Sequence, residues 1–596
     1  MNNNLGVILM KKAKNTSASP KQIKGKKAIY ITTIVWVLAI AVIGGGCSLL
    51  LPPNGSADSI ATVTTEPTEE TTVAETEPTQ KWETGFVAAF RPSATYCDGA
   101  GTPLGTIPRG TQVEYAITPD GRTELLFDGV MGYLQEGAYI VSDTADVIPH
   151  HTLYVRTAVN LRDIDGRLLG GFADKGAAVD VTGCDYVYAD GGVHMYRVSL
   201  DGEEGYITPW YLADNEGDAL ANFDDGSYAI HADRGDRYGG GGAANLDYYP
   251  REKGPIEGNA MPEECRALYM VAWRLGEVDS YIKVAENSGI NAFVVDIVDG
   301  GSIGYAADVL NKYCPSAAAA ANNTVQEYRD AIQRLKDAGY YVIGRITTFN
   351  DTYFVKDHTE HAISDTNGNP LKLSGEYWPT PYNRTAWQYK VDLAVEAVEL
   401  MGFHEIQFDY VRFPDSTWRY ENAGTIDFHN TYGETKAQAI QRFLMYATDI
   451  LHEHGAYVSA DVYGESAYTY VTAYGQYWPA ISNVVDVISG MPYPDHFSAL
   501  GTWRPWEHPY DTLHTWGQNV MQRQAETATP AVVRTWIQAY NAIREPYNTY
   551  GPNEIAAQIK GLRDSGCSGG YMTWNATSSL DKYASLIPAF APPNEE

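Results

Sequence analysis

One rhythm runs through residues 263–590 of this 596-residue chain: an amphipathic helical segment ends at a glycine, and a β-rich run follows at once. It is seen five times, for example in AENSGINAFVVDI around Gly289 and in ELMGFHEIQFDY around Gly402. Glycine ends helices because it adopts the left-handed conformation without a steric penalty. With three further β-rich runs, the pattern gives eight strands and intervening helices, which predicts a (β/α)8 TIM barrel. A doubly wound sheet is the alternative, but no G-x-G-x-x-G motif follows the first strand.

The N-terminal region predicts export. Residues 1–27 hold seven lysines and no acidic residue, and residues 28–51 are a 24-residue run without a charge. A helix of that length spans about 36 Å, enough to cross a hydrocarbon core of about 30 Å. We therefore expect a cytoplasmic tail at 1–27, a transmembrane helix or signal anchor at 28–51, and an extracellular remainder. A lipoprotein modified at Cys47 or a secreted protein is the alternative.

Composition limits the partners. The net charge of −31 argues against two negatively charged partners, nucleic acid and anionic lipid. Contact with the membrane is therefore expected only through residues 28–51. Residues 52–81 are rich in Thr, Glu and Pro and are expected to form a disordered linker. The six cysteines show no C-x-x-C spacing. We expect no cofactor and no metal, since the histidines 358 and 361 lack a clear third ligand.

Residues 82–214 contain a diverged repeat. The pattern D-G-x-x-G-Y occurs at Asp128–Tyr133 and again at Asp201–Tyr206, and an alternating strand precedes each copy. Short alternating segments with Gly and Asp turns predict two small all-β domains, 82–145 and 150–214. The second copy, with VNLRD and DGEEGYITPWYL, resembles the bacterial SH3 domains that accompany cell-wall enzymes. That resemblance implies wall or glycan binding; a spacer without a ligand is the alternative. Residues 215–262 are rich in Gly and Asp and predict a linker to the barrel.

The predicted strands carry polar residues where they end, which is where the active site of such a barrel lies. In EIQFDYVRFP, alternation points Gln407 and Asp409 into the barrel and Phe408 towards the helices. Carboxylates and aromatic rings at a barrel mouth are typical of a sugar site, because the rings stack on sugars and the carboxylates bind hydroxyl groups or transfer protons. The residues predicted to bind substrate are Asp296, Asp299, Gln407, Arg412, Tyr493, Asp495, His496, Gln538, Trp574 and Asn575.

The segments EIQFDYVRFP, SADVYGE, MPYPDHF and TWNA resemble the signatures of a bacterial family described as a putative glycoside hydrolase domain, which is distantly similar to α-amylase-like barrels. The resemblance implies that Asp409 is the nucleophile and that Asp461 or Glu465 is the acid/base. In α-amylase-like enzymes an arginine lies two residues before the nucleophile, and here that position is Gln407.

Two functions follow as hypotheses. The first is a retaining glycoside hydrolase at the cell surface, acting on a cell-wall or other polysaccharide with two carboxylates. The second is a non-catalytic glycan-binding protein with a degenerate barrel. In a purely structural interpretation, Asp409 would be the buried ion-pair partner of Arg412.

Overall fold

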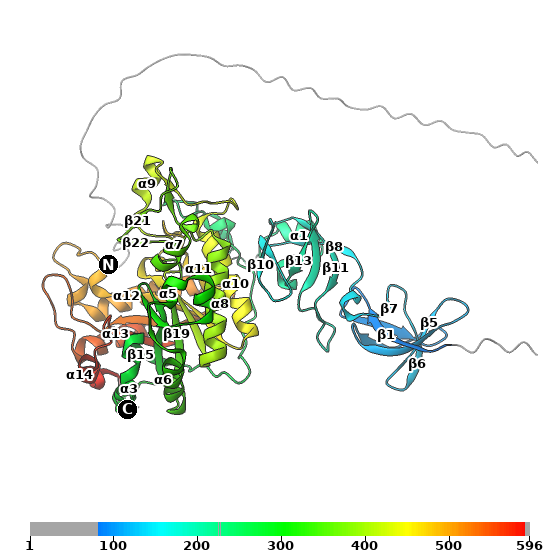
Figure 1. The fold of residues 1–596 in the computed structure, drawn as a ribbon, viewed down its shortest axis with the longest axis horizontal. Coiled ribbons are helices and arrows are strands. Elements are labelled where there is room, and N and C mark those ends of the chain that lie inside the picture. The colour runs from blue at the N-terminus through cyan, green and yellow to red at the C-terminus, as the bar shows by residue number, and fades with distance from the viewer. Residues whose placement is uncertain (1–80, 224–225, 227, 591–596) are drawn as a thin grey trace, which may run out of the picture. The chain divides into compact units, whose positions relative to one another are not determined.

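The structure is a computed structural model that describes residues 81–223, 226 and 228–590 (Figure 1). The predicted tail, membrane helix and most of the Thr/Glu/Pro-rich linker lie outside these residues. Among the residues described, no helix is both long and apolar enough to cross a membrane.

Residues 83–213 form an all-β region with two seven-stranded antiparallel sheets, which confirms the predicted β content of both copies. The first sheet has the order β3-β2-β6-β5-β4-β1-β7 and the second the order β10-β9-β13-β12-β11-β8-β14. The topologies match position by position, so the repeat in sequence is also a repeat in structure. The bounds are β1 Glu83–Ala88, β2 Ser93–Cys97, β3 Pro103–Pro108, β4 Gln112–Ile117, β5 Thr123–Phe127, β6 Val130–Leu134, β7 Tyr139–Val141, β8 His151–Val155, β9 Val159–Arg162, β10 Leu168–Ala173, β11 Ala178–Cys184, β12 Tyr196–Leu200, β13 Glu203–Ile207 and β14 Leu212–Ala213.

The large C-terminal domain is built on a nearly closed parallel barrel sheet. Its strands pair in the order β15, β16, β19, β23, β25, β26 and β27, while β28 pairs with β29 and β29 pairs back with β15. Only Arg534 separates β27 from β28, so these two short strands occupy the seventh position together. The bounds are β15 Cys265–Met270, β16 Ala292–Asp299, β19 Tyr341–Thr347, β23 Glu405–Asp409, β25 Tyr457–Tyr463, β26 Val487–Met491, β27 Val532–Val533, β28 Thr535–Gln538 and β29 Gly570–Trp574.

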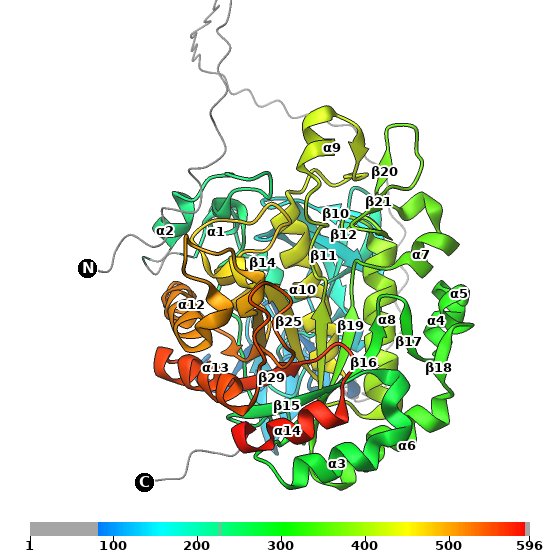
Figure 2. The same cartoon turned by 90° about the vertical axis from the view of Figure 1, so that its left-hand side faces the viewer.

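Helices cover the outside of this sheet (Figure 2). The principal ones are α3 Val278–Glu286, α6 Val325–Asp337, α8 Arg384–Met401, α10 Lys436–Glu453, α11 Trp478–Ser482, α12 Pro509–Gln524, α13 Pro552–Ser565 and α14 Leu580–Phe590. Gly402 ends α8 with a φ of 69° and Gly566 ends α13 with a φ of 96°, as the sequence predicts. Gly289 differs, because α3 already ends at Glu286 and is capped by Asn287.

Two cores result from strand alternation. Side chains such as Tyr269, Ile343 and Met572 fill the interior of the barrel, while Phe408 lies outside and packs against Phe443 of α10, with ring centroids 5.2 Å apart. The predicted outward orientation of Phe408 is therefore confirmed.

The barrel interior also contains charge. Glu405, the first residue of β23, accepts two bonds from Nη1 of Arg534, at 2.8 and 2.9 Å, and a third from the hydroxyl of Tyr341 at 3.1 Å. The side chains of Glu405 and Arg534 are both fully buried. Because unpaired charges are costly in such a place, each of the two needs the other.

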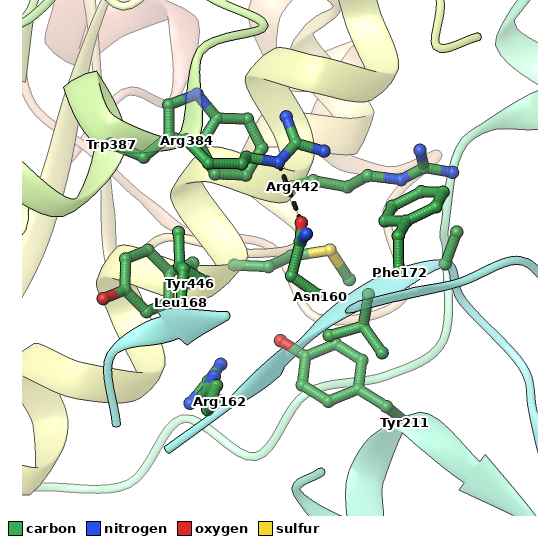
Figure 3. A pocket seen from close by; sticks show the side chains of 12 residues that line it. Asn160, Arg162, Leu168, Phe172, Tyr211, Arg384, Trp387, Arg442 and Tyr446 are labelled. Atoms are coloured by element: carbon green, nitrogen blue, oxygen red, sulfur yellow. Dashed lines mark hydrogen bonds between the residues drawn. The ribbon is translucent and has the colours of Figure 1, made fainter. Parts of the chain in front are cut away.

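The second β sheet contacts helices α8 and α10 of the barrel domain. Figure 3 shows a small cavity at this contact, where Arg384 donates from Nε to Oδ1 of Asn160 at 2.8 Å. Nearby, Asp449 of α10 accepts bonds from Arg162 and from the hydroxyl of Tyr211. The segment 215–262, expected to be a linker, contains α1 Glu216–Leu220 and α2 Tyr228–Ala232 and also packs on the barrel domain.

Candidate active site

A single arginine organises the carboxyl end of the barrel. Arg345 lies on β19, is 1% exposed, and donates from Nη1 to Asp296 at 2.8 Å and to Asp299 at 3.0 Å. Its Nη2 donates to Asp409, and its Nε lies 3.7 Å from Oδ2 of Asp461. One guanidinium group therefore binds or faces four carboxyl groups, three of them almost fully buried.

Strand register explains why these residues meet. Arg345 pairs with Asp296 on one side and with Gln407 on the other, and Asp409 pairs with the nearby Thr347. Residues that are paired across neighbouring parallel strands point to the same side of the sheet, and side chains along one strand alternate between the two sides. Arg345, its paired residues and every second residue from them therefore point into the barrel. Asp461 follows on the next strand, one residue beyond the pair formed by Phe408 and Ala460. Neighbouring strands are about 4.8 Å apart, so Asp409 and Asp461 lie side by side.

Asp409 closes its strand in a fixed orientation. One carboxylate oxygen binds Arg345, and the other accepts the backbone N–H of Tyr410 at 2.6 Å. Tyr410 has a φ of 49°, which is uncommon for a residue with a bulky side chain. Such backbone strain occurs where the surrounding structure fixes a residue for a function, and here it turns the chain directly after Asp409.

Asp461 has one satisfied and one free oxygen. Oδ1 accepts the indole N–H of Trp536 at 2.8 Å, whereas Oδ2 has no hydrogen-bond partner among the described residues. The side chain is fully buried. Burial, and next the negative charge of Asp409, raise the pKa of Asp461 well above its usual range. Both effects favour the protonated form of Asp461.

Asp296 is a second buried acid. It accepts the hydroxyl of Tyr269 at 2.5 Å and Nη1 of Arg345 at 2.8 Å. Burial and the charge of Asp299 raise the pKa of Asp296 to about 7. Asp299 lies nearer to the solvent, with 32% of its side chain exposed, and it also faces Thr347.

The pKa of Asp296 makes stability depend on pH. The folded protein keeps this proton up to about pH 7, whereas an unfolded aspartate releases it near pH 4. Folding therefore takes up a proton between these values, and the free energy of unfolding falls by about 1.4 kcal/mol per pH unit as the pH rises through that window.

We expect the variant Asp296→Asn to lack this part of the pH dependence of the free energy of unfolding, because an asparagine side chain does not titrate. Urea unfolding from pH 4 to 8 measures it, with the exposed Asp279→Asn as control; a wild-type slope in Asp296→Asn would refute the prediction.

Aromatic rings line the same site. Trp574, at the end of β29, lies 4.7 Å from the ring of Tyr269, and the guanidinium carbon of Arg345 lies 5.3 Å from the ring of Trp574. Tyr493 is buried, and burial with the nearby charges of Tyr540, Asp461 and Asp409 raises the pKa of Tyr493 well above its usual range. Its hydroxyl group therefore stays protonated beside the two carboxyl groups.

Other predicted site residues lie elsewhere. The exposed Glu465 follows β25 in a 3-10 turn, Gly464–Ala467, where it accepts the hydroxyl groups of Tyr470 and Tyr474, each at 3.0 Å. Glu465 lies beyond the end of the strand, and its carboxylate is bonded to these two tyrosines and not to Arg345. Asp461 is left as the acid/base candidate.

Arg412 does not pair with Asp409. Its Nη2 donates to the hydroxyl of Tyr463 at 2.5 Å, and its guanidinium carbon lies 4.4 Å from that ring and 5.1 Å from the ring of Trp378. The structural interpretation that pairs Arg412 with Asp409 is therefore wrong, because Arg345 occupies that place.

Several predicted binding residues instead hold loops together. Asp495 is fully buried and accepts bonds from Tyr540, Gln538 and the backbone of Ile543. Asn575 accepts the backbone N–H groups of residues 577 and 579 and so fixes the turn after β29. Gln407 lies inside the barrel and contacts Ser489 and Met572. His496 is the exception, because 55% of its side chain is exposed; burial of the remainder lowers its pKa.

The loop after β19 brings His358, Glu360 and His361 together. Asn383 Nδ2 contacts Nδ1 of His361 at 3.0 Å, and this amide is oriented because its oxygen accepts the backbone N–H of Ala386. Nδ1 of His361 must therefore accept, which leaves the ring proton on Nε2, the atom that faces Glu360. Glu360 thus supplies the third group that the sequence did not show, whereas Nε2 of His361 carries a proton in this tautomer and would have to lose it to bind a metal ion.

Three residues of the site were not predicted: Arg345, Tyr269 and Trp536. Arg345 had a readable signal, since YYVIGRI is an apolar strand that contains a charged residue, as EIQFDY is. Tyr269 and Trp536 had none, because aromatic residues in a barrel strand usually pack the core.

The fold defines a barrel protein whose acidic side chains gather at the carboxyl end of the parallel sheet, the position at which barrel enzymes carry their active sites. The chain belongs to the family described as "Putative glycosyl hydrolase domain", whose model matches residues 267–580. No curated protein matches it.

The solved structures that are similar to parts of the chain include the following three. A hypothetical protein from Ruminiclostridium thermocellum is 32% identical, with 33% of this chain and 97% of that chain covered and a TM-score of 0.28. The PgaB (BpsB) glycoside hydrolase domain from Bordetella bronchiseptica is 13% identical, with coverages of 55% and 99% and a TM-score of 0.40. A mutant β-hexosaminidase from Streptomyces plicatus is 11% identical, with coverages of 57% and 65% and a TM-score of 0.36.

Proposed function

We propose that this protein is a cell-surface retaining glycoside hydrolase that acts on a cell-wall or other polysaccharide. The observation that carries the proposal is the pair Asp409 and Asp461 on neighbouring strands, with Arg345 bound to the first and facing the second. Retaining enzymes need two carboxyl groups about 5–5.5 Å apart in opposite protonation states. Adjacent parallel strands, about 4.8 Å apart, bring the two carboxyl groups close to that spacing, and burial favours the protonated form of Asp461.

In the first step, Asp409 attacks the anomeric carbon, and the bond to the glycosidic oxygen breaks with its electron pair remaining on that oxygen. The oxygen takes the proton of Asp461. In the second step, the Asp461 carboxylate takes a proton from water, the water oxygen attacks the anomeric carbon, and the bond to Asp409 breaks with its electron pair returning to the carboxylate. Arg345 holds Asp409 throughout and supplies a positive charge beside it.

Exposed aromatic side chains support a polymeric sugar as substrate. Trp273 follows β15, Trp418 follows β23 and Tyr547 follows β28; they are 51%, 55% and 68% exposed. All three lie in segments that follow the carboxyl ends of barrel strands, where they can stack on sugar rings: Trp273 in a 3-10 helix, Ala272–Glu277, Trp418 at the start of α9, Trp418–Ala423, and Tyr547 in a loop. The proposed enzyme contains an eight-stranded TIM barrel, counted with β27 and β28 as one strand. The two β sheets act as SH3-like wall-binding domains, and residues 28–51 anchor the chain.

The test is a panel of purified polysaccharides, peptidoglycan included, incubated with the purified full-length protein. We expect new reducing ends on at least one glycan, and proton NMR of the first product should show the anomeric configuration of the substrate. An inverted product would exclude Asp409 as nucleophile. Binding to a glycan without hydrolysis of any member of the panel would favour the non-catalytic glycan-binding protein.

A further inference from the structure

The carboxyl group of Asp461 has one hydrogen-bond donor among the described residues, and that donor is Trp536. Trp536 lies on β28, two positions around the barrel from β25, and its indole N–H reaches Oδ1 of Asp461 at 2.8 Å. Both side chains are about 1% exposed. The Trp536 ring is held in turn by edge contacts with Tyr269 and Trp574, at centroid distances of 5.9 and 5.7 Å.

This bond determines which oxygen of Asp461 carries the proton. An indole N–H can only donate, and the carbonyl oxygen of a neutral carboxyl group accepts a hydrogen bond better than its hydroxyl oxygen does. Oδ1 is therefore the carbonyl oxygen, and the proton of a neutral Asp461 resides on Oδ2. The surroundings of Oδ2 agree. It lies 3.7 Å from Nε of Arg345, and neither atom has a hydrogen-bond partner among the described residues. A carboxylate oxygen would be expected to close on such a donor, whereas a hydroxyl group would not.

We propose that Trp536 is a positioning residue for the acid/base: its N–H fixes Oδ1 of Asp461, so that Oδ2 is the oxygen that delivers the proton to the glycosidic oxygen. The inference rests on the proposed function, because it assigns the orientation of the same acid. Trp536 itself does not touch the reacting atoms.

The variant Trp536→Phe removes the N–H and keeps an aromatic ring. The bond from Trp536 lowers the pKa of Asp461, so its loss should raise that pKa further and move the alkaline limb of the kcat/KM profile upwards by about one pH unit. The carboxyl group also loses its fixed orientation, so kcat should fall roughly tenfold to a hundredfold. The matched control is Trp478→Phe, which deletes another buried indole bond, the one from Trp478 to Oε1 of Gln524 at 2.9 Å, a bond in which Asp461 takes no part. Its alkaline limb should match the wild type.

Two further measurements keep the test decisive. In the first, Trp536 is replaced site-specifically by 3-benzothienylalanine, which keeps the shape of the ring system and has sulfur in place of the N–H. This replacement should shift the alkaline limb of the kcat/KM profile upwards as Trp536→Phe does. It keeps the test valid even if the smaller phenyl ring of Trp536→Phe destabilises the fold. Infrared titration of the protonated carboxyl band, assigned by its loss in Asp461→Asn, should show the same upward shift.

The outcomes separate the two proposals. An active wild type whose alkaline limb is unchanged by both replacements would overturn the role of Trp536 and leave the glycosidase proposal standing. A wild type that hydrolyses no glycan would remove both.

Discussion

Asp409→Asn is expected to lower turnover by roughly 10⁴-fold or more on any glycan that the wild-type protein hydrolyses, while glycan affinity stays within a few-fold. The amide keeps the shape of the side chain and can still accept a bond from Arg345 or from the N–H of Tyr410. It cannot form the bond to the anomeric carbon. Turnover by reducing-end assay and affinity by calorimetry on the same preparation measure the two effects.

The matched control is Asp486→Asn. Asp486 is also a buried aspartate, but it precedes β26 at the opposite end of the barrel, where it accepts the backbone N–H of Val458 and contacts His452. We expect it to lose stability and to keep the wild-type kcat. If Asp409→Asn keeps more than a few per cent of wild-type turnover, Asp409 is not the nucleophile.

Arg345→Met is expected to produce the largest loss of stability at this site, about 3–5 kcal/mol near pH 8, because it leaves several buried carboxyl groups without their cation. The effect should depend on pH. Arg345 lowers the pKa of both Asp296 and Asp461, so without it these groups hold their protons to higher pH. As the pH falls, the carboxyl groups become neutral and the penalty shrinks. Urea unfolding at pH 5 and pH 8 measures the difference.

Arg412→Met is the control for this variant. Arg412 is also a buried arginine near the mouth, but it bonds a tyrosine hydroxyl group and a backbone carbonyl, and its ion pair with the half-exposed Asp415 is long at 3.9 Å. Its loss should cost about 1–2 kcal/mol at either pH. A pH-independent loss in Arg345→Met would mean that its role is packing.

The barrel could be predicted because its signals are local. Glycine-ended helices and apolar runs are properties of single segments, and Gly402, Gly566 and Phe408 lie where they were expected. Asp409 could be found for a related reason: a charge in an apolar strand is costly and needs a partner. The same reasoning on β19 would have found Arg345.

The rest of the site depends on contacts that no single segment shows. A polar residue at a strand end serves equally well to bind a ligand or to tie a loop, and Asp495 and Asn575 do the second. Glu465 follows Asp461 closely in the sequence, but it lies in a 3-10 turn where it binds two tyrosine hydroxyl groups. Trp536 reaches Asp461 from a strand 75 residues later, a relation visible only once the barrel has closed.

The ion pair between Glu405 and Arg534 has a consequence for synthesis of the chain. The two residues are 129 positions apart, so at roughly 5–20 residues per second Glu405 leaves the ribosome several seconds or more before its partner exists. Until then, a nascent chain with the first six strands would have to bury a carboxylate without its cation, and burying a charge in that way is strongly unfavourable. Partial barrels are thereby disfavoured during translation. When the seventh strand is added, it extends the sheet towards closure, and its Arg534 neutralises the buried charge of Glu405. We therefore expect the part of the domain before this strand and the part after it to fold together in one cooperative step.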